Sequence, residues 1–83
     1  MDRIDAIVAT VLKIPVSSVT EETSPDTIDK WDSLAHLNLV MAIEIEFQIS
    51  LSPEDAMEML SVGLIRTILK ERGVDIAQGE GNQ

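Results

Sequence analysis

The chain contains no cysteine and almost no aromatic residues: there is one Trp, one Phe and no Tyr among its 83 residues. Without cysteine there is no disulfide framework and no thiolate metal site, and a core without aromatic side chains must be aliphatic. No apolar run approaches the roughly 18 residues that a membrane-spanning helix needs. The first residues do not show the charged, apolar and small-residue sections of a signal peptide. We therefore expect a cytoplasmic protein that does not enter membranes.

Basic residues are also scarce, because 6 Lys and Arg stand against 15 Asp and Glu, which gives a formal net charge of −9. Nucleic acid and anionic lipid surfaces repel such a chain, whereas basic protein surfaces attract it. The length suits one small domain with one modest core and leaves little room for an enclosed catalytic cavity. With 45% hydrophobic residues, the chain is nevertheless expected to fold.

The spacing of apolar residues predicts a first amphipathic helix over residues 3–13, which Pro15 prevents from continuing. Residues 14–31 are rich in Ser, Thr, Pro and Asp, so they predict a long ordered loop, with a short helical turn near residues 19–22. Three apolar residues are expected to pin this loop to the core: Val16, Val19 and Ile28.

A second helix is predicted over residues 33–47, and it carries two apolar stripes. The expected core stripe contains Leu39, Val40, Ile43 and Phe47. The other stripe contains Leu34, Leu37, Met41 and Ile45. A helix in a domain this small seldom buries two stripes, so we expect the second one to be partly exposed, as a docking surface would be.

The third helix is predicted to be short, over residues 53–59, with Ser52 as its cap. Ser61 is expected to cap a fourth helix that ends near Gly73. Several residues of these two helices are expected in the core: Ala56, Met59, Leu60, Leu64, Ile65, Ile68 and Leu69. Residues 74–83 predict a flexible C-terminal tail. The predicted fold class is all-α, a small four-helix bundle with a long first loop and a short third helix.

Asp32, Ser33 and Leu34 stand where the second helix is predicted to begin. A helix N-terminus presents unpaired N–H groups and the positive end of the helix dipole, which together favour a phosphate. Physical chemistry alone therefore says only that this position suits an anion or a phosphate, so that a phosphodiester on Ser33 would be stabilised here, while an ordinary helix cap stays the alternative.

This motif is followed by Leu39-Val40-Met41-Ala42-Ile43-Glu44, by Glu46-Phe47 and by Ile49. Together these residues resemble the acyl carrier protein family, over about residues 4–73. The resemblance implies a non-catalytic, monomeric carrier domain at residues 1–73. It implies that Ser33 bears a covalent 4′-phosphopantetheine arm, which a phosphopantetheinyl transferase installs from coenzyme A.

The resemblance also implies the cargo and the partners. Acyl intermediates would be carried as thioesters to loading and processing enzymes with basic docking surfaces, in fatty-acid or polyketide-like biosynthesis. Carried over by position, the partner contacts would be Asp32, Leu34, Leu37, Met41 and Glu44. A further hypothesis is that part of the acyl chain enters the interior between the second and third helices.

Some positions depart from the pattern of the primary fatty-acid carriers. Ala35, Asn38 and Ile45 stand where those carriers usually have acids, and Trp31 replaces a small residue. These departures suggest a specialised carrier in a polyketide-like or other secondary pathway. The paired glycines common before the serine of peptidyl carriers are missing, so an aminoacyl cargo is less favoured but stays open.

The residues around this motif allow three other interpretations. Ser33 can be a plain helix cap in an unmodified helical interaction domain. Asp32, Ser33 and His36 can be imagined as a hydrolytic triad, although adjacent residues on one helical turn supply neither an oxyanion hole nor a substrate pocket. Asp26, Asp29 and Asp32 recur at every third position, unlike the alternating ligands and central glycine of a calcium-binding loop. No metal site is therefore expected.

Overall fold

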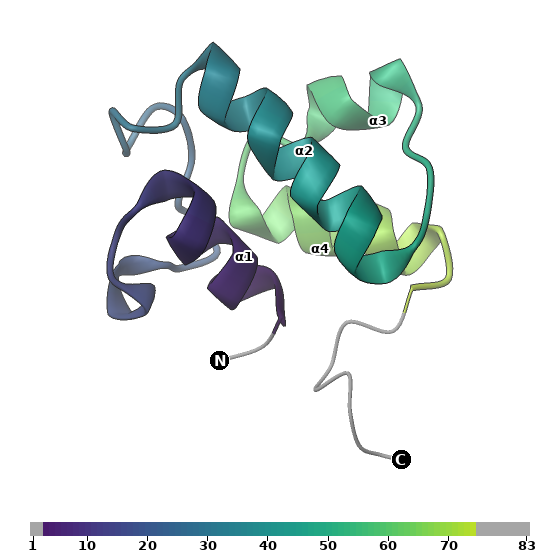
Figure 1. The fold of residues 1–83 in the computed structure, drawn as a ribbon, viewed down its shortest axis with the longest axis horizontal. Coiled ribbons are helices and arrows are strands. Elements are labelled where there is room, and N and C mark those ends of the chain that lie inside the picture. Colours follow the sequence, from purple (N-terminus) through teal and green to yellow (C-terminus); the bar gives the residue numbers. More distant parts are fainter. Residues whose placement is uncertain (1–2, 75–83) are drawn as a thin grey trace.

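The computed structural model describes residues 3–74, and this part of the chain is helical without strands (Figure 1). Its elements are α1 (Arg3–Leu12), a 3₁₀ turn (Val16–Ser18), α2 (Ser33–Phe47), α3 (Pro53–Glu58) and α4 (Val62–Glu71). The predicted all-α fold is confirmed, and α2 has the predicted bounds. Of the predicted C-terminal tail, all but Val74 lies outside the described residues.

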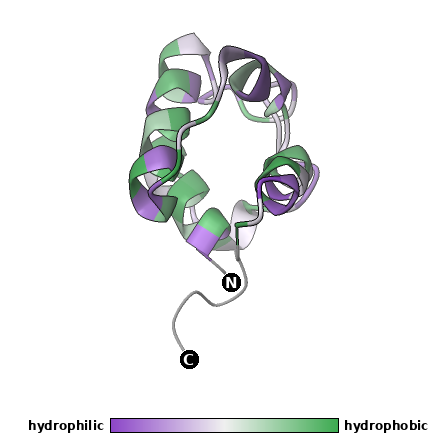
Figure 2. Cartoon of the chain, turned by 90° about the vertical axis from the view of Figure 1, so that its right-hand side faces the viewer, coloured by the Kyte–Doolittle hydropathy of each residue, from purple (hydrophilic) through white to green (hydrophobic). Residues whose placement is uncertain are grey.

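The core is aliphatic except for Trp31, which is only 2% exposed. It is built from all the helices, since α1 packs against both α2 and α4, and α3 packs against α4. Figure 2 shows hydrophobic residues along part of every helix. The side chains buried most completely are Ile4, Val8, Leu12, Leu39, Ile43, Met59, Val62, Ile65 and Leu69. Burying each contributes about 1.5–3 kcal/mol.

Two leucines that we expected in this core are on the surface. Leu60 is 51% exposed and Leu64 is 45% exposed. The physical reason is where the helices end and begin: α3 stops at Glu58, so the neighbouring Met59 occupies the core position instead of Leu60. In α4 the buried stripe begins with Val62, which places Leu64 on another side of the helix.

The long loop before α2 is ordered, as predicted, but two details of the prediction were wrong. The helical turn lies at Val16–Ser18 rather than near residues 19–22. Val16 is exposed, because this turn carries it away from the core, whereas Val19 and Ile28 pack against the core as expected.

Loop carbonyl groups satisfy the first backbone donors of α4. The N–H of Val62 donates to the carbonyl oxygen of Thr23, and the N–H of Gly63 donates to that of Glu21, both at 3.0 Å. The buried Thr23 side chain in turn accepts a hydrogen bond from the backbone N–H of Thr20 at 2.9 Å. The loop is therefore anchored at the N-terminus of α4 where a free helix end would expose unpaired donors.

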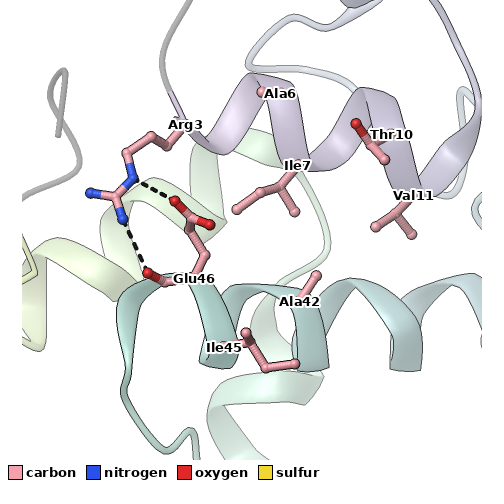
Figure 3. A pocket seen from close by; sticks show the side chains of 8 residues that line it. All are labelled: Arg3, Ala6, Ile7, Thr10, Val11, Ala42, Ile45 and Glu46. Carbon is pink, nitrogen blue, oxygen red and sulfur yellow. Dashed lines mark hydrogen bonds and ion pairs between the residues drawn. The ribbon is translucent and has the colours of Figure 1, made fainter. Parts of the chain in front are cut away.

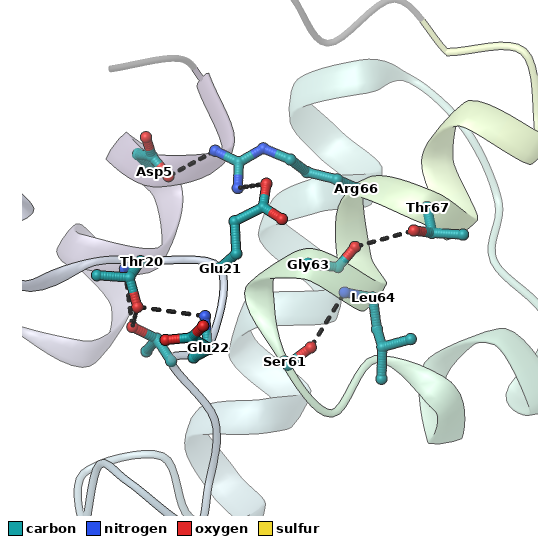
Figure 4. Close-up of polar contacts among 10 residues, drawn as sticks. Asp5, Thr20, Glu21, Glu22, Ser61, Gly63, Leu64, Arg66 and Thr67 are labelled. Carbon is teal, nitrogen blue, oxygen red and sulfur yellow. Dashed lines mark hydrogen bonds and ion pairs between the residues drawn. The ribbon is translucent and has the colours of Figure 1, made fainter.

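Side chains strengthen the same junction (Figure 4). Arg66 on α4 pairs with Asp5 on α1 at 2.7 Å and with Glu21 of the loop at 3.3 Å. The hydroxyl of Ser61 accepts a hydrogen bond from the N–H of Leu64 at 3.1 Å, which confirms the predicted cap of α4. These contacts fix the loop that leads into α2.

The cap of α3 is also confirmed. The Ser52 hydroxyl accepts from the N–H of Asp55 at 3.0 Å, and the Asp55 carboxylate accepts from the N–H of Ser52 at 3.3 Å. This reciprocal arrangement is a capping box, and Pro53 occupies the first helical position. Helix α3 therefore begins at a defined residue in spite of its short length.

Candidate functional site

The residue that caps α2 is Asp32, not Ser33. Asp32 has extended backbone angles, φ −96° and ψ −171°, and its Oδ1 accepts a hydrogen bond from the N–H of Ala35 at 2.9 Å. Ser33 is the first helical residue. The interpretation of Ser33 as a plain helix cap was therefore wrong, because the neighbouring carboxylate already performs that role.

The Ser33 hydroxyl is exposed and makes no hydrogen bond within residues 3–74. The carbonyl of Asp32 accepts the first intrahelical hydrogen bond, from the N–H of His36 at 2.8 Å. The N–H groups of Ser33 and Leu34 have no acceptor in the described part of the chain. An unused hydroxyl next to two unpaired N–H groups, at the positive end of a 15-residue helix, fits a phosphodiester on Ser33.

His36 is held by hydrogen bonds at both ring nitrogens. Its Nδ1 lies 3.1 Å from Nε1 of Trp31, and its Nε2 lies 2.7 Å from the carbonyl oxygen of Ala56 on α3. An indole N–H only donates and a carbonyl only accepts, so these partners assign a neutral His36 with its hydrogen on Nε2. The two rings are stacked, with centroids 6.2 Å apart. Trp31 therefore packs beside His36 at the start of α2.

These hydrogen bonds prevent His36 from acting as the base of a hydrolytic triad with Ser33 and Asp32. Neither nitrogen of His36 is free to accept a proton from Ser33, since Nδ1 accepts from Trp31 and Nε2 carries the hydrogen that Ala56 accepts. The Asp32 carboxylate points to the backbone of α2 as its cap. The geometry therefore lacks both the base and the orienting acid that a hydrolytic serine needs.

An open pocket of about 580 Å³ lies beside Ser33. It is bounded by the long loop, by the start of α2 and by the connection between α3 and α4. Its lining residues are Pro25, Trp31, Asp32, Ser33, His36, Leu37 and Leu60. Leu60 was not predicted to belong to this site, and its exposure, which follows from the early end of α3, is what brings it there.

The second apolar stripe of α2 is exposed, as predicted. The exposed fractions are 67% for Leu34, 60% for Leu37, 56% for Met41 and 76% for Ile45. On the core side of the same helix, Leu39 and Ile43 are completely buried. Exposed aliphatic side chains in a row of this length are typical of a surface that a partner covers.

Glu44 is half-buried and has a role within the fold that the sequence did not reveal. Its Oε2 accepts a hydrogen bond from the backbone N–H of Leu51 at 2.8 Å, which holds the connection between α2 and α3 against α2. On the other flank of α2, an open groove of about 420 Å³ runs between α1 and α2 (Figure 3). Ile45 lines that groove, and an ion pair of Arg3 and Glu46 lies beside it.

A comparison with protein families agrees with this geometry. Residues 2–69 match the family described as the phosphopantetheine attachment site. The match spans most of the chain, so the chain belongs to this family. Domains of this family carry a covalently attached 4′-phosphopantetheine and are generally non-catalytic. The protein is therefore a phosphopantetheine carrier, which implies interaction with a phosphopantetheinyl transferase and with acyl-processing enzymes.

No helix within residues 3–74 is both long enough and apolar enough to cross a membrane.

Proposed function

We propose that Ser33 is the residue that bears the phosphopantetheine arm and that the protein presents acyl groups to partner enzymes. The observation that carries this proposal is the division of roles at the start of α2. Asp32 supplies the cap, and Ser33 keeps an exposed hydroxyl without a partner in the described chain. A helix N-terminus then stabilises the phosphodiester formed there. When attached, the arm supplies a thiol that holds the acyl group as a thioester.

The chain's own contribution is to expose the serine and to dock its partners. We propose five residues as contacts: Asp32, Leu34, Leu37, Met41 and Glu44. The three apolar members are all more than half exposed and lie along one side of α2. The net charge of −9 accelerates encounters with basic surfaces, and the apolar residues supply the contact area. Glu44 uses one carboxylate oxygen within the fold and keeps the other for a partner.

For the pathway, we propose a specialised carrier in polyketide-like or related fatty-acid biosynthesis rather than bulk fatty-acid synthesis. The docking side of α2 supports this, because Ile45 is 76% exposed and Asn38 is also exposed where the primary fatty-acid carriers usually have acids. A partner for this face needs more apolar and less basic surface than a partner for those carriers.

The test is the intact mass of the full chain after incubation with coenzyme A and a broad-specificity transferase. The wild type should gain the mass of one phosphopantetheine, and Ser33→Ala should gain none. Because Ser33 makes no hydrogen bond in the described chain, Ser33→Ala should change the stability by no more than about 0.5 kcal/mol. Ser50→Ala is the matched control, since Ser50 is also exposed, and it should be modified normally.

The result would contradict the proposal if the wild type gained no mass or if Ser33→Ala were still modified. A wild-type chain that stays unmodified while binding a partner would instead favour an unmodified interaction domain. An aminoacyl cargo is distinguished by offering the modified chain to acyl-loading and aminoacyl-loading enzymes and weighing the products.

A further inference from the structure

The pocket beside Ser33 has aliphatic walls that nothing within residues 3–74 covers. Leu37 on α2 and Leu60 after α3 both line the pocket, and they are 60% and 51% exposed. Its volume of about 580 Å³ falls in the range of ligand pockets, about 300–1,000 Å³. Among the described residues that line it, Asp32 is the only acid, and Ser33 is itself one of them. A mostly apolar group tethered to Ser33 therefore has a site within immediate reach.

A chain of hydrogen bonds separates this pocket from the helical interior. Trp31 lines the pocket and also belongs to the buried core, so its ring is part of the wall between them. Its indole N–H donates to His36, whose Nε2–H donates to the carbonyl of Ala56 at 2.7 Å. This last bond joins α2 to α3 beside Ser33. A group passing between these helices would have to break it and leave the Nε2–H of His36 without its acceptor, while the Ala56 carbonyl would keep only the hydrogen bond from the N–H of Met59 at 3.3 Å.

The groove between α1 and α2 is a less accessible alternative. It is also mostly apolar, but it lies between α1 and α2 (Figure 3) and shares no lining residue with the Ser33 pocket. The residue of α2 that lines this groove closest to Ser33 is Ala42, nine positions beyond Ser33, which corresponds to about 13.5 Å along the helix. An occupant tethered to Ser33 would have to cross the exposed stripe to reach it.

We propose that an aliphatic acyl chain, carried on an arm at Ser33, folds back into the outer pocket between Leu37 and Leu60. The Trp31–His36–Ala56 bridge keeps the chain out of the interior between α2 and α3. This inference rests on the proposed function and names both the class of cargo and its binding site. It replaces the hypothesis, drawn from the sequence, that the acyl chain enters the interior.

The experiment uses the full-length chain loaded with a ¹³C-labelled octanoyl group and, separately, with an acetyl group. Intact mass first shows that one arm is attached and that Ser33→Ala stays unloaded, and a failure at this step would contradict the proposed function instead. NMR then records nuclear Overhauser contacts from the octanoyl chain. We expect contacts with the methyl groups of Leu37 and Leu60. Contacts with Ile43 or Met59 in the interior, contacts with Ile7 or Ile45 in the other groove, or no contacts with the protein would each overturn the inference.

A pair of variants provides a matched control. Leu60 and Leu64 are both exposed leucines, but only Leu60 lines the pocket. The readout is the difference in the Trp31 indole N–H chemical shift between the octanoyl and acetyl forms. Leu60→Ala should reduce this difference by roughly half or more, because one of the two leucines that line the pocket is lost, and Leu64→Ala should leave it unchanged. Equal effects of the two substitutions would overturn the inference.

The bridge is tested separately with His36→Phe, which keeps an aromatic ring but removes both hydrogen bonds. In this variant we expect octanoyl contacts with Ile43 or Met59 to appear. If the variant folds and the chain still contacts only Leu37 and Leu60, the bridge is not what excludes it. If the variant does not fold, the wild-type contacts and the Leu60–Leu64 comparison still decide where the chain lies.

Discussion

Asp55 and Arg72 join the first turn of α3 to the end of α4. The Nε–H of Arg72 donates to Oδ2 of Asp55 at 3.0 Å, and the guanidinium pairs with the same carboxylate. The Arg72 hydrogen bond holds the pKa of Asp55 below its ordinary value of 3.8, with help from the N–H of Ser52, although burial acts in the opposite direction. One carboxylate thus serves both the capping box of α3 and the contact with α4.

The first prediction concerns acid. Because the pKa of Asp55 is lowered in the fold, the unfolded chain takes up this proton more readily. The contribution of Asp55 to stability is therefore complete above pH 3.8 and is lost as the pH falls below 3.8 through the lowered folded-state pKa. We expect Asp55→Asn to reduce the free energy of unfolding near neutral pH and to flatten its dependence on pH below 3.8.

Urea unfolding followed by circular dichroism, at a series of pH values, measures this dependence. Glu54→Gln is the control, since Glu54 is an exposed acid in the same helical turn. Parallel loss of stability below pH 3.8 in Asp55→Asn and in the wild type would contradict the prediction.

The second prediction separates two roles of Asp32. Asparagine caps helices about as well as aspartate but has no charge. Asp32→Asn should therefore keep the melting temperature and slow the modification by the transferase, if the carboxylate helps to seat that enzyme or its metal ion. Asp32→Ala should also lose about 1 kcal/mol of stability, because the acceptor for the Ala35 N–H disappears. An unchanged modification rate in Asp32→Asn would remove Asp32 from the proposed contacts.

The third prediction contrasts two faces of α2. Met41 is 56% exposed, whereas Ile43, two residues later, is completely buried. Met41→Ala should change the stability by no more than about 0.5 kcal/mol, and it should raise the KM of the transferase for this protein several-fold. Ile43→Ala should lose about 2–5 kcal/mol of stability. Thermal unfolding and modification kinetics measure both, and a normal KM for Met41→Ala would exclude it as a docking contact.

The fourth prediction concerns Glu44, which the fold needs as a hydrogen-bond acceptor and the proposed docking surface needs as a negative charge. Glu44→Gln keeps an oxygen acceptor for the Leu51 N–H but loses the charge. We expect its stability to be close to that of the wild type and its docking to basic partner surfaces to weaken. Glu44→Ala should lose stability as well, by about 1–3 kcal/mol, because the N–H of Leu51 loses its acceptor. If Glu44→Gln docks normally in kinetic assays at low salt, Glu44 acts only within the fold.

The helices could be predicted from the sequence because their signals are local. Ser52 followed by Pro53, and Ser61 before an apolar stripe, are cap signals that need no tertiary information, and both were confirmed. Local signals did not decide which residue caps α2, since Asp32 and Ser33 are adjacent and both residue types cap well.

Other features depend on contacts between residues far apart in the sequence. His36 binds the carbonyl of Ala56, twenty positions away, and no spacing rule anticipates this partner. The exposure of Leu60 depends on α3 ending at Glu58, within the margin by which sequence patterns place helix ends. The exposed stripe of the candidate site was thus predictable and the pocket beside it was not, whereas the role of Ser33 as the attachment residue stays a prediction.

Trp31 is the only tryptophan of the chain and is buried against His36 at the start of α2. The intrinsic fluorescence of the unlabelled protein therefore comes from this end of the molecule alone. Emission intensity and quencher access will report events at the serine-bearing end of α2, and a disturbance confined to the far end of that helix will leave the signal unaltered.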